Sequence, residues 1–354
     1  MIYLHIGRAK TGTTALQAFL GRNRRRLADA GLQFPRTLMR GRAQHDLALA
    51  LTPSRMRRMT GEARSKASAE LEQAKRLVAA GRDLIISSEM FQRAEPHLVA
   101  EIFPPGQTKV IVYIREQLDA LISAYAQRIQ GTMELATFVE FAGRFDANYL
   151  EFLDGWADAF GADRLIVGIY DRACLLNGDI RADFLAHLPV DPAPLNFERG
   201  KSQQGNPTIG AAPIEFKGVL NALVPEDVQR RLLIFDNLAA ITTKFPRLRT
   251  SHAFAEIFRC RFAASNKIVQ RRYLGYRAFP KHTVSGPPSA VGRDEAIDLS
   301  MAALGEIAPE TASRVADYLK PDDIANLHPL LPADWREAEE ELEHRLEHRM
   351  SAMG

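Results

Sequence analysis

The chain has 354 residues, 46% of them hydrophobic, and its formal net charge at pH 7 is only +3. This composition predicts an ordinary globular protein of one large domain or two smaller ones. The small net charge argues against a nucleic-acid partner, because nucleic-acid-binding domains generally carry a strong basic excess. Two cysteines, Cys174 and Cys260, suggest neither a disulfide framework nor a metal site.

We expect no targeting or membrane segment. It starts almost directly with a strand-like run, without the basic and apolar stretch of a signal peptide. No apolar run approaches the roughly 18 residues that a membrane span needs. We therefore expect a cytoplasmic protein with no membrane span.

The first predicted unit is a strand, a glycine-containing loop and a helix. Residues 1–6 form an apolar run of strand length, and residues 7–14 read Gly-Arg-Ala-Lys-Thr-Gly-Thr-Thr. The first N–H groups of a helix have no partner within it, so this turn predicts a site for an anion. The hydroxyls of Thr13 and Thr14 and the ammonium of Lys10 would favour a phosphate. The simpler alternative is a Gly- and Thr-rich turn that only caps the helix.

Two further positions with chemical potential follow. Residues 83–88 predict a buried strand, and Glu89 stands at its carboxyl end, where ligands bind in open parallel sheets. The alternative is that Ser88 caps the next helix and Glu89 interacts with its dipole. His45 begins a short predicted helix over 44–51, where it could face a cleft or be a structural histidine.

Residues 109–114 are the clearest strand, because they are β-branched, apolar and bounded by turn signals. Arg115 follows directly. Its planar guanidinium suits phosphate oxygens and stays charged. The alternative is an ion pair of Arg115 with a local carboxylate, Glu116 or Asp119.

Strands alternate with helices as far as about residue 190, which predicts an α/β domain with a parallel sheet and helices on both faces. Residues 165–170 are a further predicted strand. The predicted helices of this part are 13–30, 44–51, 62–80, 95–103, one from about 117, 134–160 and 179–188. We predict an α/β core over 1–190 and a linker with a helical region packed on that core over 191–354.

The region after residue 190 shows no strong strand pattern. Its predicted helices are 214–223, 225–243, 251–272, 293–305, 309–319 and 334–350. The last of these alternates acidic and basic residues, so it is either a solvated helix or the contact of a homo-oligomer.

The glycine loop differs from the loop of nucleoside triphosphatases, because Thr13 stands where that motif has lysine. Lys10-Thr11-Gly12-Thr13-Thr14 after a strand, followed by Leu16-Gln17, resembles the 5′-phosphosulfate loop of the sulfotransferases, in particular of bacterial members. Arg115 and Ser123 have the spacing with which that family binds a 3′-phosphate. Tyr170, at a strand end, resembles a tyrosine that approaches adenine there.

The resemblance implies a P-loop-like core that binds 3′-phosphoadenosine-5′-phosphosulfate, with adenosine 3′,5′-bisphosphate as product and no metal. It implies that Lys10 contacts the oxygen that bridges phosphate and sulfate. Glu89 would be the general base, with His45 as the competing candidate. The acceptor would be a carbohydrate or a glycosylated small molecule. The residues that would hold the donor nucleotide are Arg8, Lys10, Thr11, Gly12, Thr13, Thr14, Arg115, Ser123 and Tyr170.

Two other regions and two other functions complete these expectations. Residues 262–274 resemble a C-terminal element of bacterial sulfotransferase-like proteins, and the basic loop 281–286 is a weaker candidate for a nucleotide contact. The alternative functions are a nucleotide kinase or other triphosphate-hydrolysing enzyme, and a non-catalytic protein that binds a nucleotide without turnover.

Overall fold

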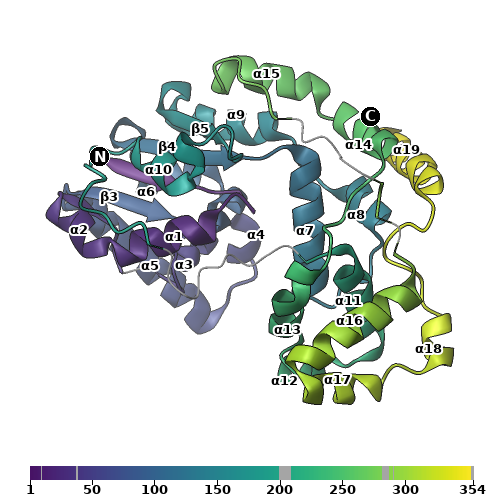
Figure 1. Ribbon diagram of the computed structural model, residues 1–354. Helices are drawn as coiled ribbons and strands as arrows, with labels where there is room; N and C mark the ends of the chain where they lie inside the picture. Colours follow the sequence, from purple (N-terminus) through teal and green to yellow (C-terminus); the bar gives the residue numbers. More distant parts are fainter. Residues whose placement is uncertain (9, 37–38, 199–208, 281–286, 290, 352–354) are drawn as a thin grey trace. The chain divides into compact units, whose positions relative to one another are not determined.

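A computed structural model describes the chain except for residues 9, 37–38, 199–208, 281–286, 290 and 352–354 (Figure 1). The chain forms two compact units. The first unit comprises 1–116, 148–205 and 264–280, and the second comprises 117–147, 206–263 and 281–354. The predicted domains, 1–190 and 191–354, have one boundary in the sequence, whereas each compact unit consists of three separate stretches of the chain.

The first unit contains a five-stranded, all-parallel sheet in the order β2-β3-β1-β4-β5. Its strands are β1 (Ile2–His5), β2 (Leu32–Gln33), β3 (Asp83–Ser87), β4 (Thr108–Ile114) and β5 (Leu165–Ile169). In the central strand, Leu4 aligns with Ile86 of β3 and with Val110 of β4. The segments that follow β1, β3 and β4 therefore all leave the sheet at the carboxyl ends of its strands.

Helices cover both faces of this sheet. Tyr3, Ile85 and Ile111 share a hydrophobic cluster with Phe19 of α1 (Thr13–Arg22). Side chains alternate along a strand, so Leu4 points to the opposite face, and it is also fully buried. Apolar residues buried on both faces are typical of parallel sheets in α/β proteins. The predicted α/β class and parallel sheet are confirmed.

The other helices of the first unit lie between the strands or follow β5. They are α2 (Arg24–Asp29), α3 (His45–Ala50), α4 (Pro53–Met56), α5 (Gly61–Ala79), α6 (Pro96–Ile102), α9 (Tyr149–Phe160), α10 (Ile180–Leu185) and, apart from its first residue, α15 (Ala263–Tyr273). Short 3-10 helices are η1 (Glu89–Arg93), η2 (Pro105–Gln107), η3 (Ala162–Arg164) and η4 (Leu176–Gly178).

All regular secondary structure in the described part of the second unit is helical. Its helices are α7 (Gln117–Gly131), α8 (Phe138–Arg144), α11 (Ala211–Leu223), α12 (Glu226–Arg231), α13 (Ile234–Ile241), η6 (Thr242–Lys244), α14 (His252–Cys260), α16 (Arg293–Ile307), α17 (Pro309–Ala316), α18 (Pro321–Ala325) and α19 (Trp335–Ser351). One core joins α11, α13, α16 and α17 through Phe216, Leu238, Ala303 and Val315. None of the described helices is both long and apolar enough to cross a membrane.

Several predicted helices are shorter than their sequence pattern. The helix predicted over 13–30 breaks at Asn23, because its side-chain amide donates to Phe19 O (3.1 Å) and to Asn196 O (3.0 Å). The Asn23 side-chain oxygen also accepts from the Asn196 N–H at 2.7 Å. The helix predicted over 225–243 breaks at Leu233, whose φ is +50°. The predictions over 134–160 and 251–272 also each correspond to two helices, and α18 was not predicted.

Candidate functional site

The glycine loop connects β1 to α1 through three left-handed backbone positions. These are Gly7 (φ +41°), Lys10 (φ +66°) and Gly12 (φ +75°). Gly12 is the N-cap of α1, and its carbonyl accepts the first helical hydrogen bond from Leu16 at 3.1 Å. No side chain in the described part of the chain caps this helix. No side chain therefore accepts a hydrogen bond from the first-turn N–H groups among the described residues. N–H groups of this kind at the start of a helix can bind an anion.

The threonines of the loop differ in their environment. Thr11 is buried, and its hydroxyl donates to Arg8 O at 2.7 Å, so it stabilises the turn itself. Thr13 is buried and Thr14 is exposed, as the first two residues of α1. A hydroxyl already used inside the loop is a poorer candidate for a ligand contact than the hydroxyl of Thr14.

Two cationic side chains lie at this loop. Arg115 follows β4, and its Nη1 lies 3.5 Å from Lys10 O. Burial lowers the pKa of the Lys10 ammonium, and the charge of Arg115 lowers it further. Among the described residues, no carboxylate forms an ion pair with Lys10. An anion at the start of α1 would offset the repulsion between the two cations.

Tyr170 contacts the loop, as the residue that follows β5. Its N–H donates to Ile114 O at 2.8 Å, which fixes its backbone beside the end of β4. Its ring packs so closely on Gly12 that a Cβ added there would lie 2.6 Å from the ring. Glycine is therefore required at position 12 by both its φ and this contact.

Arg8 lies against the aromatic side chains of α9. Its guanidinium carbon is 4.7 Å from the ring centroid of Phe152 and 5.4 Å from that of Tyr149. The Tyr149 hydroxyl in turn donates to Arg115 O at 2.7 Å. A cation–π contact of this kind holds Arg8 in place. Its predicted contact with the nucleotide stays a prediction.

The end of β3 is joined to the start of α3 by Gln44. The Gln44 N–H donates to Ser87 O (3.0 Å), and its side-chain oxygen accepts from the Ser87 N–H (2.9 Å). His45 and Ser88, which follow Gln44 and Ser87, are also in contact, with 2.8 Å between His45 Nδ1 and Ser88 Oγ. This pairing places His45 beside the carboxyl end of β3.

Glu89 lies between the glycine loop, α1 and α3. A Cβ added at Gly7 would be 3.2 Å from the Cα and Cβ of Glu89, so this residue packs on the start of the loop. Glu89 Oε1 is 3.9 Å from His45 Nε2, and Glu89 Oε2 accepts from Gln17 Nε2 at 2.9 Å. The structure thus brings together the two residues that the sequence presents as competing bases.

Ser88 forms the cap that the alternative interpretation predicts. Ser88 Oγ accepts from the Met90 N–H at 3.1 Å and caps η1, of which Glu89 is the first residue. The cap and an acid–base role are compatible, because the cap uses Ser88 and the backbone and leaves the Glu89 carboxylate to other partners.

Two predicted contacts cannot be assigned to this site. Ser123 is buried on α7 in the second unit, whereas Arg115 belongs to the first, so their joint role stays a prediction. The basic loop 281–286 lies outside the described residues.

Sequence reasoning did not assign a role to Gln17, Gln44 or Ser87. Each is a polar side chain with 4% exposure or less. The sequence does place a glutamine among apolar residues on the predicted buried side of a helix. Such a pattern indicates a specific polar contact, because a buried amide needs hydrogen-bond partners. Sequence alone does not say which partners these are.

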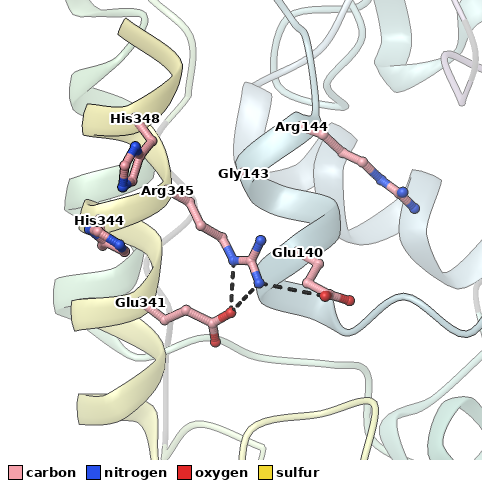
Figure 2. Close-up of a pocket in the computed structure, with 7 residues that line it drawn as sticks. All are labelled: Glu140, Gly143, Arg144, Glu341, His344, Arg345 and His348. Carbon is pink, nitrogen blue, oxygen red and sulfur yellow. Dashed lines mark hydrogen bonds and ion pairs between the residues drawn. The ribbon is translucent and has the colours of Figure 1, made fainter. Parts of the chain in front are cut away.

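The second unit contains an open pocket of about 630 Å³ between α8 and α19, lined by Glu140, Gly143, Arg144, Glu341, His344, Arg345 and His348 (Figure 2). Arg345 Nη2 contacts Glu140 Oε1 (3.5 Å) and Glu341 Oε1 (2.6 Å). The guanidinium of Arg345 is therefore shared between two carboxylates of the pocket. None of the predicted site residues lines this pocket.

The comparisons with known proteins give no activity. No family model matches the chain. An uncharacterized protein of Archaeoglobus fulgidus is 28% identical over 178 residues, which cover 48% of this chain and 46% of that protein. The chain therefore matches about half the length of this curated relative.

Proposed function

We propose that the protein is a sulfotransferase that moves a sulfuryl group from 3′-phosphoadenosine-5′-phosphosulfate to a hydroxyl or amine of an acceptor. The acceptor class is a carbohydrate or a glycosylated small molecule. The observation that carries the proposal is the packing of Glu89 on Gly7, with His45 3.9 Å away. A carboxylate and an imidazole thus lie directly beside the glycine loop, which supports an acid–base role next to a bound phosphate.

The position of the loop in the sheet supports this proposal. The loop follows the central strand β1, with β3 on one side and β4 on the other. Open α/β sheets bind ligands beyond the carboxyl ends of the strands, at the point where the strand order changes direction. A P-loop-like sulfotransferase core would have its donor here.

The residues of the loop fit the donor nucleotide. The uncapped start of α1 and the hydroxyl of Thr14 would hold the 5′-phosphate. The guanidinium of Arg115 would bind the 3′-phosphate, and Tyr170, packed on Gly12, would stand near the adenine. The donor supplies the sulfuryl group, and the protein supplies charge, orientation and a base.

Each proposed catalytic side chain has one task. Glu89 takes the proton of the acceptor group as that group attacks sulfur. The new bond to sulfur forms while the bond between sulfur and the bridging oxygen breaks, and the electron pair stays on the phosphate oxygen. The ammonium of Lys10 stabilises the charge that develops there. Positioned charges and general bases of this kind act on the transition state.

Thermal-shift measurements separate this function from its alternatives. We expect adenosine 3′,5′-bisphosphate to raise the melting temperature, and ATP with Mg²⁺ to leave it unchanged. The opposite result would indicate a nucleotide kinase or triphosphatase, and a response to neither nucleotide would contradict the proposal.

Turnover then distinguishes an enzyme from a binder. The measurement is transfer of label from ³⁵S-labelled donor to a panel of 4-nitrophenyl glycosides and amino sugars. Binding of the bisphosphate without transfer to any of these acceptors would favour a non-catalytic nucleotide-binding protein.

A further inference from the structure

Gln17 is a polar residue on the buried side of the helix that follows the glycine loop. Its exposure is 4%, and its neighbours Leu16, Phe19 and Leu20 are fully buried. An amide placed in such surroundings is costly unless it forms hydrogen bonds. Its Nε2 donates to Glu89 Oε2 at 2.9 Å, so the amide is directed at one oxygen of one carboxylate.

The other oxygen of this carboxylate has a different neighbour. Glu89 Oε1 lies 3.9 Å from His45 Nε2, beyond hydrogen-bond distance. Oε2 is therefore engaged by a short hydrogen bond, whereas Oε1 faces an imidazole that does not occupy it. The two carboxylate oxygens of Glu89 are thus inequivalent.

Gln17 also has a neighbour in the sheet, the hydroxyl of Ser87 at the end of β3. Its Nε2 lies 3.5 Å from Ser87 Oγ, and Ser87 Oγ lies 2.8 Å from His5 Nδ1. His5 is fully buried, and burial lowers its pKa to about 3. The imidazole is therefore neutral near pH 7 and adds no positive charge to the contacts that lead through Ser87 and Gln17 to Glu89.

We propose that Gln17 is the positioning residue of Glu89: its amide holds Oε2, so that Oε1 is the oxygen that takes the proton of the acceptor. This inference depends on the proposed sulfotransferase function. Gln17 lies one helical turn after Thr13, so one helix carries both the anion-binding start of α1 and the residue that orients the base. The donor phosphate and the base are therefore placed relative to each other by a single rigid element.

The test is Gln17→Met, which keeps the length of the side chain but removes the amide. We expect kcat to fall about tenfold to a hundredfold, the range for a lost hydrogen bond to a charged group. Affinity for adenosine 3′,5′-bisphosphate, measured by calorimetry, should stay within about twofold. Gln130→Met is the matched control, because Gln130 is a buried helical glutamine of the second unit that donates to Phe235 O. It should leave both quantities unchanged.

The pH profile of kcat separates orientation of the base from a merely structural effect. A hydrogen bond donated to a carboxylate favours its charged form, so Gln17→Met should move the acid limb to higher pH. His45 is an ionisable group 3.9 Å from Glu89 Oε1, so the same profile is measured with Gln17→Met in a His45→Gln background. The shift should persist there.

A double-mutant cycle completes the test. In a Glu89→Gln background, Gln17→Met should cause little further loss of kcat, because both changes act on one group. If Gln17→Met does not fold, Gln17→Asn is measured instead, since it keeps an amide that is too short to reach Oε2. Normal kcat and an unmoved profile in the variant, with an active wild type, would overturn this inference alone. A wild type that transfers no label and binds no bisphosphate would overturn the proposed function as well.

Discussion

His45 and Glu89 form a neighbouring pair, with His45 Nε2 3.9 Å from Glu89 Oε1. His45 is fixed from its other ring nitrogen, because Nδ1 lies 2.8 Å from Ser88 Oγ. Glu89 is fixed through Oε2 by Gln17. The two side chains are thus held by different partners and face each other across a short gap. A hydroxyl that approaches the pair from the side could lie within hydrogen-bond distance of both atoms.

The roles within the pair can be separated by substitution. Glu89→Gln keeps the shape of the side chain but removes the base, and we expect kcat to fall by about a hundredfold or more. His45→Ala should cause a smaller loss, because the carboxylate remains. The measurement is kcat at saturating acceptor. If Glu89→Gln retains near-normal turnover while His45→Ala loses it, the base is His45.

Lys10 should matter more for turnover than for binding. In the proposed reaction, its ammonium would face charge that grows only as the bond from sulfur to the bridging oxygen breaks, so it would stabilise the transition state selectively. We expect Lys10→Ala to lower kcat by about a hundredfold or more, with a much smaller loss of affinity for adenosine 3′,5′-bisphosphate. Lys109→Ala, at the opposite end of β4, is the matched control. Equal losses in turnover and affinity would show that Lys10 only binds the nucleotide.

Arg115 should recognise the 3′-phosphate. Arg115→Ala is expected to weaken adenosine 3′,5′-bisphosphate by roughly one to two decades, the range for a lost charge-assisted hydrogen bond. Adenosine 5′-phosphate, which lacks that group, should be affected far less. Calorimetry with both nucleotides measures the difference, and Arg164→Ala before β5 serves as the control. The same loss for both nucleotides would contradict this assignment.

The regular part of the fold was predictable from local pattern. The β-branched run 109–114 and the apolar run 83–88 each have the length and boundaries of a buried strand, and both correspond to strands of the sheet. The position of Glu89 at a strand end followed from that pattern. These features depend on residues close in sequence, so a single chain reveals them.

The contacts that complete the site depend on residues far apart in sequence. Asn23 ends α1 through bonds to Asn196, 173 positions away, and no local signal predicts that break. His45 lies near Glu89 through the pairing of Gln44 with Ser87 and its own contact with Ser88, each 43 positions apart. The left-handed conformation of Lys10 was equally hidden, because non-glycine residues seldom adopt it.

Buried His5 should make the first unit sensitive to acid. Its pKa is about 3 in the folded protein because burial disfavours the charged ring, against an ordinary value of 6.5. Between these two values, the unfolded chain binds a proton that the folded chain does not. The contribution of His5 to stability is therefore complete above pH 6.5 and is lost as the pH falls toward 3, by about 1.4 kcal/mol per pH unit.

His5→Leu tests this directly, because leucine cannot take up the proton. We expect the free energy of unfolding to fall less steeply between pH 6 and 4 in this variant than in the parent. Urea unfolding should be followed by fluorescence in a Trp335→Phe background, where Trp156, buried in the first unit, is the remaining tryptophan. His97→Leu, an exposed position on α6 of the same unit, should keep the parent slope. An unchanged slope in His5→Leu would show that other groups, such as paired carboxylates, govern the acid sensitivity of this unit.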